Sequence, residues 1–300
     1  MLLLPASLLV LLAAPATMAV PTSTERLNAR MARRGLPPVS THARPILADV
    51  PSIHGPRLDA RTPSKTPNTT YSHNWAGVVV EAANGTFQSV SGSFIVPNLA
   101  DGPAKTDNSA SSAWVGIDGT ICETAILQTG IDFYWSPYFP NHVDMYPWYE
   151  YWPGFEADWY DVTVNIGDAV TVNATVTSAS SGTVSLVNHS QGWVRTQDLI
   201  APPDSPLCQS GAEWIVEAVG SDLGLVAFAN FDVVHFTDAT AFTAAGGVVG
   251  PGSATSIYEI RQDSGLLLTE TSYNAHSARI QYVGDRNITI PNGPGVLPGQ

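Results

Sequence analysis

Short segments in which apolar residues alternate with Thr, Ser or Asn limit this chain to a fold rich in β-strands. Three of them follow one another at 161–166, 169–176 and 183–187. A period of two places successive side chains on opposite faces of an extended strand, so each segment has one apolar face and one polar face. Turn residues stand between them, at Gly167-Asp168 and at 180–182. The pattern predicts a meander of three strands.

Further strand-like segments follow, and no segment has a helical period. The 25 Gly and 23 Pro also disfavour long helices. We therefore expect an all-β protein, an antiparallel β-sandwich, and the roughly 235 residues after residue 65 suit one large domain of this kind. The later predicted strands are 224–231, 233–236, 256–260, 266–270 and 278–283, with a turn at 263–265 between two of them.

The first 19 residues are typical of a secretory signal peptide. Apolar runs at 2–4 and 8–14 precede small residues at 17–19 that suit a cleavage site. The apolar run is shorter than the roughly 20 residues that a membrane-spanning helix needs, which disfavours an anchor. We expect a secreted, extracellular protein.

Charge divides the remaining chain into a basic arm and an acidic body. Residues 20–65 hold eight of the 13 Lys and Arg but only three of the 26 Asp and Glu, which leaves a net charge of −18 on residues 66–300. A disordered linker would fit the arm, but opposite charges favour a propeptide that docks on the body at neutral pH and detaches as carboxylates protonate. We expect processing between residues 50 and 71, and a catalytic domain over 66–300.

The acidic body also limits the partners and conditions of the protein. It would bind nucleic acid or anionic membranes poorly. With five basic residues it forms few ion pairs, so acid removes little native stabilisation and relieves self-repulsion. We expect a monomer that works well below neutral pH.

The two cysteines, Cys122 and Cys208, favour one disulfide over a metal site in a secreted chain. Seven scattered His form no zinc motif, so we expect no metal and no cofactor. A Cys122–Cys208 bond would bring Gln128 and Glu213 into one neighbourhood. Five sequons suit a secreted glycoprotein, at Asn68, Asn84, Asn173, Asn188 and Asn287.

Glu213 beside Gln128 would form a workable hydrolytic site, in which the carboxylate takes a proton from water and the carboxamide donates to an oxyanion. The pattern alone also fits simpler interpretations. Glu213 and Glu217 share one strand face and suit a solvated surface, and a lone Gln is usually a satisfied surface residue. Asp118, in Gly-Ile-Asp-Gly, suits a turn.

Several motifs in order along the chain resemble those of the glutamic peptidases, also called eqolisins. The resemblance runs from about residue 71 to about residue 283, and it implies two large, curved, stacked sheets of the concanavalin A type. The matching segments are Asn-Trp-Ala-Gly at 74–77, Val-Ser-Gly-Ser-Phe-Ile-Val-Pro at 90–97, Ala-Trp-Val-Gly-Ile-Asp-Gly at 113–119, Glu-Thr-Ala-Ile-Leu-Gln-Thr-Gly at 123–130, Trp-Tyr-Glu at 148–150 and Ala-Glu-Trp-Ile-Val-Glu at 212–217.

The resemblance implies a secreted acid endopeptidase with protein or peptide substrates. Glu213 would be the general base and then the acid, Gln128 would stabilise the oxyanion, and Glu217 would support them. Aromatic motif residues would contact the substrate, although packing in the core explains them equally well. The candidate substrate-binding residues are Trp75, Trp114, Trp148, Tyr149 and Glu150.

Two alternatives to a peptidase remain at this point. A glycosidase on a similar sandwich would use two carboxylates, such as Glu213 and Glu217. A lectin-like or wall-binding module would stack its aromatic residues on sugars. In the glycosidase Gln128 would be dispensable and Glu217 essential, whereas the module would have no need of a basic arm that is cleaved.

Overall fold

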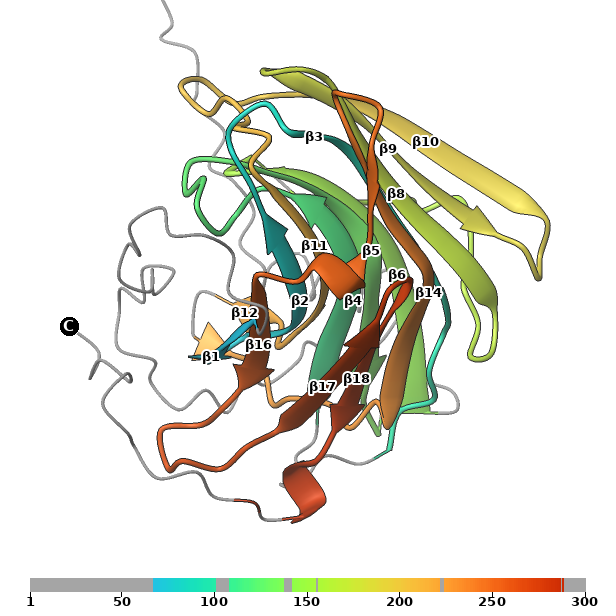
Figure 1. The fold of residues 1–300 in the computed structure, drawn as a ribbon. Coiled ribbons are helices and arrows are strands. Elements are labelled where there is room, and N and C mark those ends of the chain that lie inside the picture. Colours follow the sequence, from blue (N-terminus) through green and yellow to red (C-terminus); the bar gives the residue numbers. More distant parts are fainter. Residues whose placement is uncertain are drawn as a thin grey trace, which may run out of the picture.

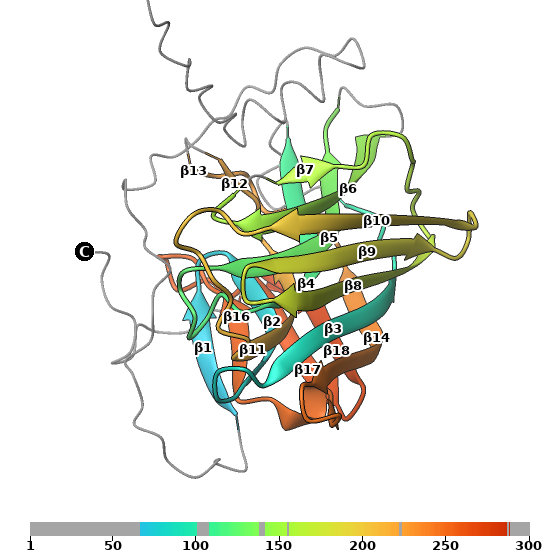
Figure 2. The same ribbon diagram turned by 90° about the horizontal axis from the view of Figure 1, so that it is seen from above.

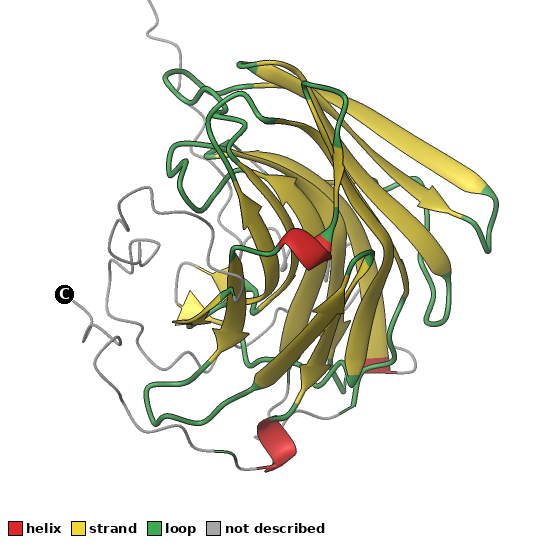
Figure 3. Ribbon diagram, in the orientation of Figure 1, coloured by secondary structure: helices red, strands yellow, loops and turns green. Residues whose placement is uncertain are grey.

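The fold is known from a computed structural model that describes residues 67–100, 108–137, 142–154, 156–221, 224–286 and 288. The predicted signal peptide, the basic arm and the Asn287 sequon lie outside these residues. Figure 1 shows two large curved sheets stacked on each other, and Figure 3 shows how fully strands dominate. The predicted all-β sandwich is confirmed.

The first sheet is antiparallel except for its edge strand β1, which runs parallel to β16. Its eight strands, in spatial order, are β1 (Asn68–Ser72), β16 (Ser256–Ile260), β2 (Trp75–Glu81), β11 (Gly211–Glu217), β4 (Ser109–Ile117), β5 (Ile126–Trp135), β6 (Val143–Trp152) and β7 (Ala157–Asp158).

The second sheet is antiparallel throughout. Its strands, in spatial order, are β10 (Trp193–Ile200), β9 (Ser181–Asn188), β8 (Ala169–Ser178), β3 (Phe87–Ile95), β14 (Val233–Thr243), β18 (Ser277–Tyr282) and β17 (Thr269–Asn274), with β15 (Val248–Val249) also paired to β14. A small ribbon of β12 (Gly220–Ser221) and β13 (Gly224–Leu225) and the 3-10 helices η2 (Pro251–Ser253) and η3 (Gly284–Arg286) complete the elements described here.

The strand pattern predicted β8, β9, β16 and β18 and the start of β14, but it failed at three segments. Segment 161–166 is not a strand, because the Asn165 N–H is bonded to the Asp168 carboxylate instead of a neighbouring strand. Segment 224–231 forms only β13 and single bridges, although its Phe residues are buried. The strand expected at 266–270 begins at Thr269, because residues 262–267 close a turn.

The core lies between the two sheets, and strand alternation sorts the side chains of β11 between it and the outside. Trp214 is fully buried and its indole Nε1 donates to the Ser91 carbonyl of β3, so it points toward the second sheet. Glu213, Ile215 and Glu217 therefore lie on the opposite face, here called the outer face of the first sheet. Viewed from above, β8, β9 and β10 run across β4 and β5 on the core side (Figure 2).

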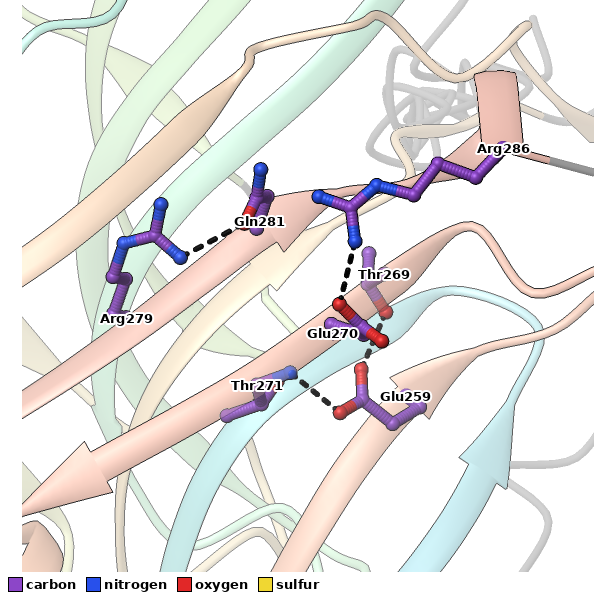
Figure 4. Close-up of polar contacts among 7 residues, drawn as sticks. All are labelled: Glu259, Thr269, Glu270, Thr271, Arg279, Gln281 and Arg286. Atoms are coloured by element: carbon purple, nitrogen blue, oxygen red, sulfur yellow. Dashed lines mark hydrogen bonds and ion pairs between the residues drawn. The ribbon is translucent and has the colours of Figure 1, made fainter. Parts of the chain in front are cut away.

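Glu259 ties the two sheets together where β16 lies beside β17. Its carboxylate accepts hydrogen bonds from the Thr269 hydroxyl at 2.7 Å and from the Thr271 N–H at 2.6 Å. Figure 4 shows this contact, with the exposed Arg286–Glu270 ion pair beside it. Burial raises the pKa of Glu259 to about 7, against the effect of these donors. The described residues include no helix long and apolar enough to cross a membrane.

Candidate active site

Gln128 and Glu213 lie in one row across the outer face of the first sheet. In the strand register, Glu213 on β11 is opposite Gly116 on β4, and Gly116 is opposite Gln128 on β5. Glu150 on β6 continues the row beside Gln128. Directly paired residues share a face, and neighbouring strands are about 4.8 Å apart, so the Cα atoms of Gln128 and Glu213 lie about 10 Å apart.

A glycine at position 116 lets two neighbouring groups lie close over β4 in the middle of this row. A Cβ atom at this position would lie 2.9 Å from Glu213 Oε1 and 2.9 Å from Cζ3 of Trp114. Any larger residue would therefore displace the Glu213 carboxyl group or the Trp114 ring. The row places an acid, a glycine and an amide side by side.

Both polar groups are withdrawn from solvent and incompletely bonded. Glu213 is fully buried, and neither of its carboxyl oxygens has a hydrogen-bond partner in the described part of the chain. Gln128 is 6% exposed, and its Nε2 donates to Glu150 Oε2 at 2.6 Å while its Oε1 has no partner among the described residues. Unpartnered buried polar atoms are costly, so this arrangement suits groups that bind something else.

Burial raises the pKa of Glu213 well above its usual value, and the negative charges of Asp118, Glu81 and Glu217 add to the effect. A carboxyl group in such surroundings holds its proton tightly, and its ionised form is a strong base. A donor placed on the ionised carboxylate would lower the pKa again.

Asp118 and the disulfide fix the end of β11 that leads to Glu213. The Asp118 carboxylate accepts N–H groups from Gln209, Ser210 and Gly211 at 2.8, 2.7 and 3.2 Å. The predicted disulfide between Cys122 and Cys208 is confirmed, with Cα atoms 5.8 Å apart. Asp118 has the left-handed φ of 72° expected for a turn, but it also anchors this neighbouring segment.

Most of the predicted aromatic contacts gather on the outer face near the row. Trp75, Trp114 and Trp148 pack with Ile215 in one cluster. Tyr149 points the opposite way along β6 and packs on Trp159, with ring centroids 4.8 Å apart. The expectation of a solvated face around Glu213 is wrong, since that side chain is fully buried.

Glu217 is partly buried in the same cluster and is engaged by three side chains. Trp114 Nε1 donates to its Oε2 at 2.9 Å, and Asn74 Nδ2 donates to its Oε1 at 3.1 Å. Burial raises the pKa of Glu217 to about 7, and these donors, with Trp75, oppose the rise.

A glycosidase pair of Glu213 and Glu217 is disfavoured by the hydrogen bonds of Glu217. Both of its oxygens already accept side-chain donors, from Trp114 and from Asn74.

The sequons differ in accessibility. Asn68 and Asn84 are exposed, and Asn173 is partly buried. Asn188 is fully buried and its Nδ2 donates to Asp168 at 2.7 Å, so a glycan there would require this bond to be absent. Glycosylation stays a prediction.

Comparison with known proteins gives this site its context. The model of the peptidase A4 family matches residues 73–282. The chain belongs to the peptidase A4 family. Aspergillopepsin-2 of Aspergillus niger is 37% identical over 286 residues, which cover 90% of this chain and 96% of that protein. Scytalidopepsin B of Scytalidium lignicola is 35% identical over 56% of this chain and 63% of its own length.

Solved structures of glutamic peptidases share the fold. Scytalido-glutamic peptidase with a transition state analog inhibitor matches with a TM-score of 0.62 and 31% identity, over 71% of this chain and 99% of that one. Aspergilloglutamic peptidase from Aspergillus niger matches with a TM-score of 0.54 and 44% identity, over 58% and 99%. The resemblance seen in the motifs is confirmed: this A4-family chain is a glutamic-type peptidase, a hydrolase.

Sequence reasoning missed the contributions of Gly116, Asn74 and Asp118 to the site. Gly116 and Asp118 stand in the Gly-Ile-Asp-Gly motif, whose pattern indicates a turn and no role for either residue in the site. Asn74 stands in Asn-Trp-Ala-Gly, where the pattern points to Trp75 alone. Nowhere in the described ranges do three or more His, Cys, Asp or Glu form a group that could hold a metal ion.

Proposed function

We propose that this peptidase is a secreted acid endopeptidase in which Glu213 and Gln128 act together on a water molecule and the scissile peptide bond. The observation that carries the proposal is the row in which Gly116 separates the two side chains and leaves their oxygens without partners among the described residues. In this proposal Glu213 holds a water and Gln128 meets the peptide carbonyl.

The reaction begins with ionised Glu213 as a general base. It takes a proton from the water, whose oxygen attacks the carbonyl carbon, and the carbonyl electron pair moves onto oxygen. The Nε2–H of Gln128 stabilises this oxyanion. Protonated Glu213 then gives its proton to the amide nitrogen, the C–N bond breaks, and the acid and amine products leave with Glu213 ionised again.

Glu150 would set the orientation of Gln128. A carboxamide has two N–H donors, and one of them is directed to Glu150 Oε2 at 2.6 Å. The second is then free to meet the oxyanion, and Oε1 is turned away from Glu150. Because an amide does not titrate, it keeps this donor in acid.

The test compares hydrolysis of an unfolded protein at acid pH by the processed wild type and by Glu213→Gln and Gln128→Ala, with an aspartic-peptidase inhibitor present throughout. The matched control is Glu270→Gln, which alters an exposed glutamate on β17 of the other sheet. We expect Glu213→Gln to lose more than about a thousandfold in kcat and Gln128→Ala to lose about a hundredfold or more, because an oxyanion donor contributes this much. Full activity of a folded Glu213→Gln variant would refute the proposal.

The basic arm would be the propeptide of this enzyme. Its eight Lys and Arg and the net charge of −18 on residues 66–300 support docking at neutral pH and release in acid. A synthetic peptide of residues 20–65 should inhibit the mature enzyme at pH 6 more strongly than at pH 3. N-terminal sequencing of the secreted protein should find a start between residues 50 and 71. An intracellular protein that keeps residues 1–65 would contradict secretion and processing.

A further inference from the structure

Glu217 takes no part in the reaction proposed above, yet its carboxylate is more fully engaged than that of Glu213. Trp114 Nε1 and Asn74 Nδ2 each donate to a different oxygen, at 2.9 and 3.1 Å. Trp75 contributes a further side-chain donor. Both oxygens keep acceptor capacity whether the Glu217 carboxyl group is ionised or protonated, so both donors are held.

The donor on Trp114 is part of a ring that reaches the catalytic row. Its Nε1 meets Glu217, while its Cζ3 lies 2.9 Å from the position that a Cβ of residue 116 would occupy. That same position is 2.9 Å from Glu213 Oε1. One rigid indole therefore extends from Glu217 to the middle of the row, beside Glu213.

Asn74 is a second hydrogen-bond donor to Glu217, and it lies in the turn directly before Trp75. Ser72 Oγ accepts the N–H groups of Asn74 and Trp75 at 3.2 and 3.0 Å and donates to Asn74 Oδ1 at 3.1 Å. This contact fixes the Asn74 amide with its NH₂ toward Glu217. The Trp75 ring then packs edge-on against Trp114, with centroids 5.0 Å apart.

We propose that Glu217 is a positioning residue for peptide hydrolysis, which acts through the indole of Trp114 to keep the space beside Glu213 in the shape that the scissile bond requires. The inference rests on the proposed function, because it assumes that the bond is cleaved in that space. A displacement of a reacting group by about 1 Å can cost a hundredfold in rate. The loss of Glu217 should therefore appear in kcat even though this side chain contacts neither the water nor the scissile bond.

The test uses an exchange of donor and acceptor between Glu217 and Asn74 in the processed enzyme. In Glu217→Gln, the new NH₂ faces either the Asn74 NH₂ or the Trp114 N–H, and Ser72 prevents the Asn74 amide from turning. In the double variant Asn74→Asp/Glu217→Gln, the new amide can donate to residue 74 and still accept from Trp114. We expect Glu217→Gln to lower kcat about tenfold to a hundredfold with little change in KM for a short peptide, and the double variant to recover most of the loss.

A cycle with Trp114→Phe, which removes the indole N–H, tests whether Glu217 acts through this ring. Trp114→Phe should cost at least as much in kcat as Glu217→Gln, because it also removes the Cζ3 edge beside position 116. Adding Glu217→Gln to Trp114→Phe should then cost little more, because the contact is already absent, so the losses should be far from additive. The free energy of unfolding and the near-ultraviolet circular dichroism of each variant identify any variant that does not fold. If Glu217→Gln does not fold, the kcat of the double variant, compared with that of the wild type, still tests the inference.

Three results would overturn the inference: an unchanged kcat in folded Glu217→Gln, additive losses with Trp114→Phe, or a double variant that recovers wild-type stability without recovering kcat. Failure of the proposed function would look different. Glu213→Gln would then retain activity, whatever the behaviour of residue 217.

Discussion

Glu259 should make the fold less stable as the pH rises toward neutral. Its folded-state pKa is about 7, against 4.5 as its ordinary value, because its carboxyl group is buried between β16 and β17. The folded protein thus keeps a proton that the unfolded chain releases near pH 4.5. The stability linked to this proton is fully present below about pH 4.5 and is lost as the pH rises through about 7. A difference of about 2.5 pKa units corresponds to roughly 3 kcal/mol.

The variant Glu259→Gln removes this titration and keeps the size of the side chain. We expect urea unfolding, followed by tryptophan fluorescence, to show that wild type loses about 3 kcal/mol more than the variant between pH 4.5 and pH 7.5. Both chains should carry Glu213→Gln to prevent self-cleavage, which also removes the titration of Glu213 from the comparison.

The exposed neighbour Glu270 provides the control. Its ion pair with Arg286 at 2.9 Å lies at the surface, where such pairs contribute little. Glu270→Gln should therefore follow the wild-type dependence on pH closely, because the charge of Glu270 is only the smallest of the causes that raise the pKa of Glu259. If the Glu259→Gln and wild-type curves are parallel between pH 4.5 and pH 7.5, the buried-carboxyl argument is wrong.

Two further predictions concern the row of Glu213, Gly116 and Gln128 on the first sheet. Gly116→Ala should abolish peptide hydrolysis while the protein still folds, because the new methyl group would lie 2.9 Å from Glu213 Oε1. A kcat on a short peptide within tenfold of the wild-type value would contradict this prediction. Asp118→Asn should lower the pKa of Glu213 by removing a nearby negative charge. The acid side of the pH profile of kcat/KM should therefore move to lower pH. A profile that is unchanged or moves to higher pH would show that the charge of Asp118 does not raise the pKa of Glu213.

The sequence predicted what depends on local pattern and on motifs. Alternation located β8 and β9, because each has one face in the core. Motifs singled out Gln128 and Glu213, which the structure places in one row and whose catalytic roles stay a prediction. The two cysteines indicated the disulfide, which the structure contains.

What the sequence did not predict depends on which strands are neighbours. Gly116 matters only because β4 lies between β5 and β11 in a register that places it opposite both catalytic candidates. The burial of Glu213 likewise cannot be predicted from its own segment, because β11 lies between β2 and β4, which are distant in the sequence. Segment 161–166 has the alternation of a strand, but a side-chain acceptor satisfies its backbone instead. Pattern assigns a residue to a face and leaves its partners undetermined.

The parallel pairing of β1 with β16 limits where the proposed propeptide can be cut off without loss of a strand. β1 begins at Asn68, inside the interval in which we expect the chain to be cut, and the ring of Tyr71 lies 4.5 Å from the guanidinium carbon of the buried Arg261. A cut upstream of Asn68 leaves this strand in place. A cut within it would uncover Arg261 and the hydrogen-bonding edge of β16, an open template on which another chain could add a strand. Accurate processing would therefore protect the mature enzyme from aggregation as well as release its activity.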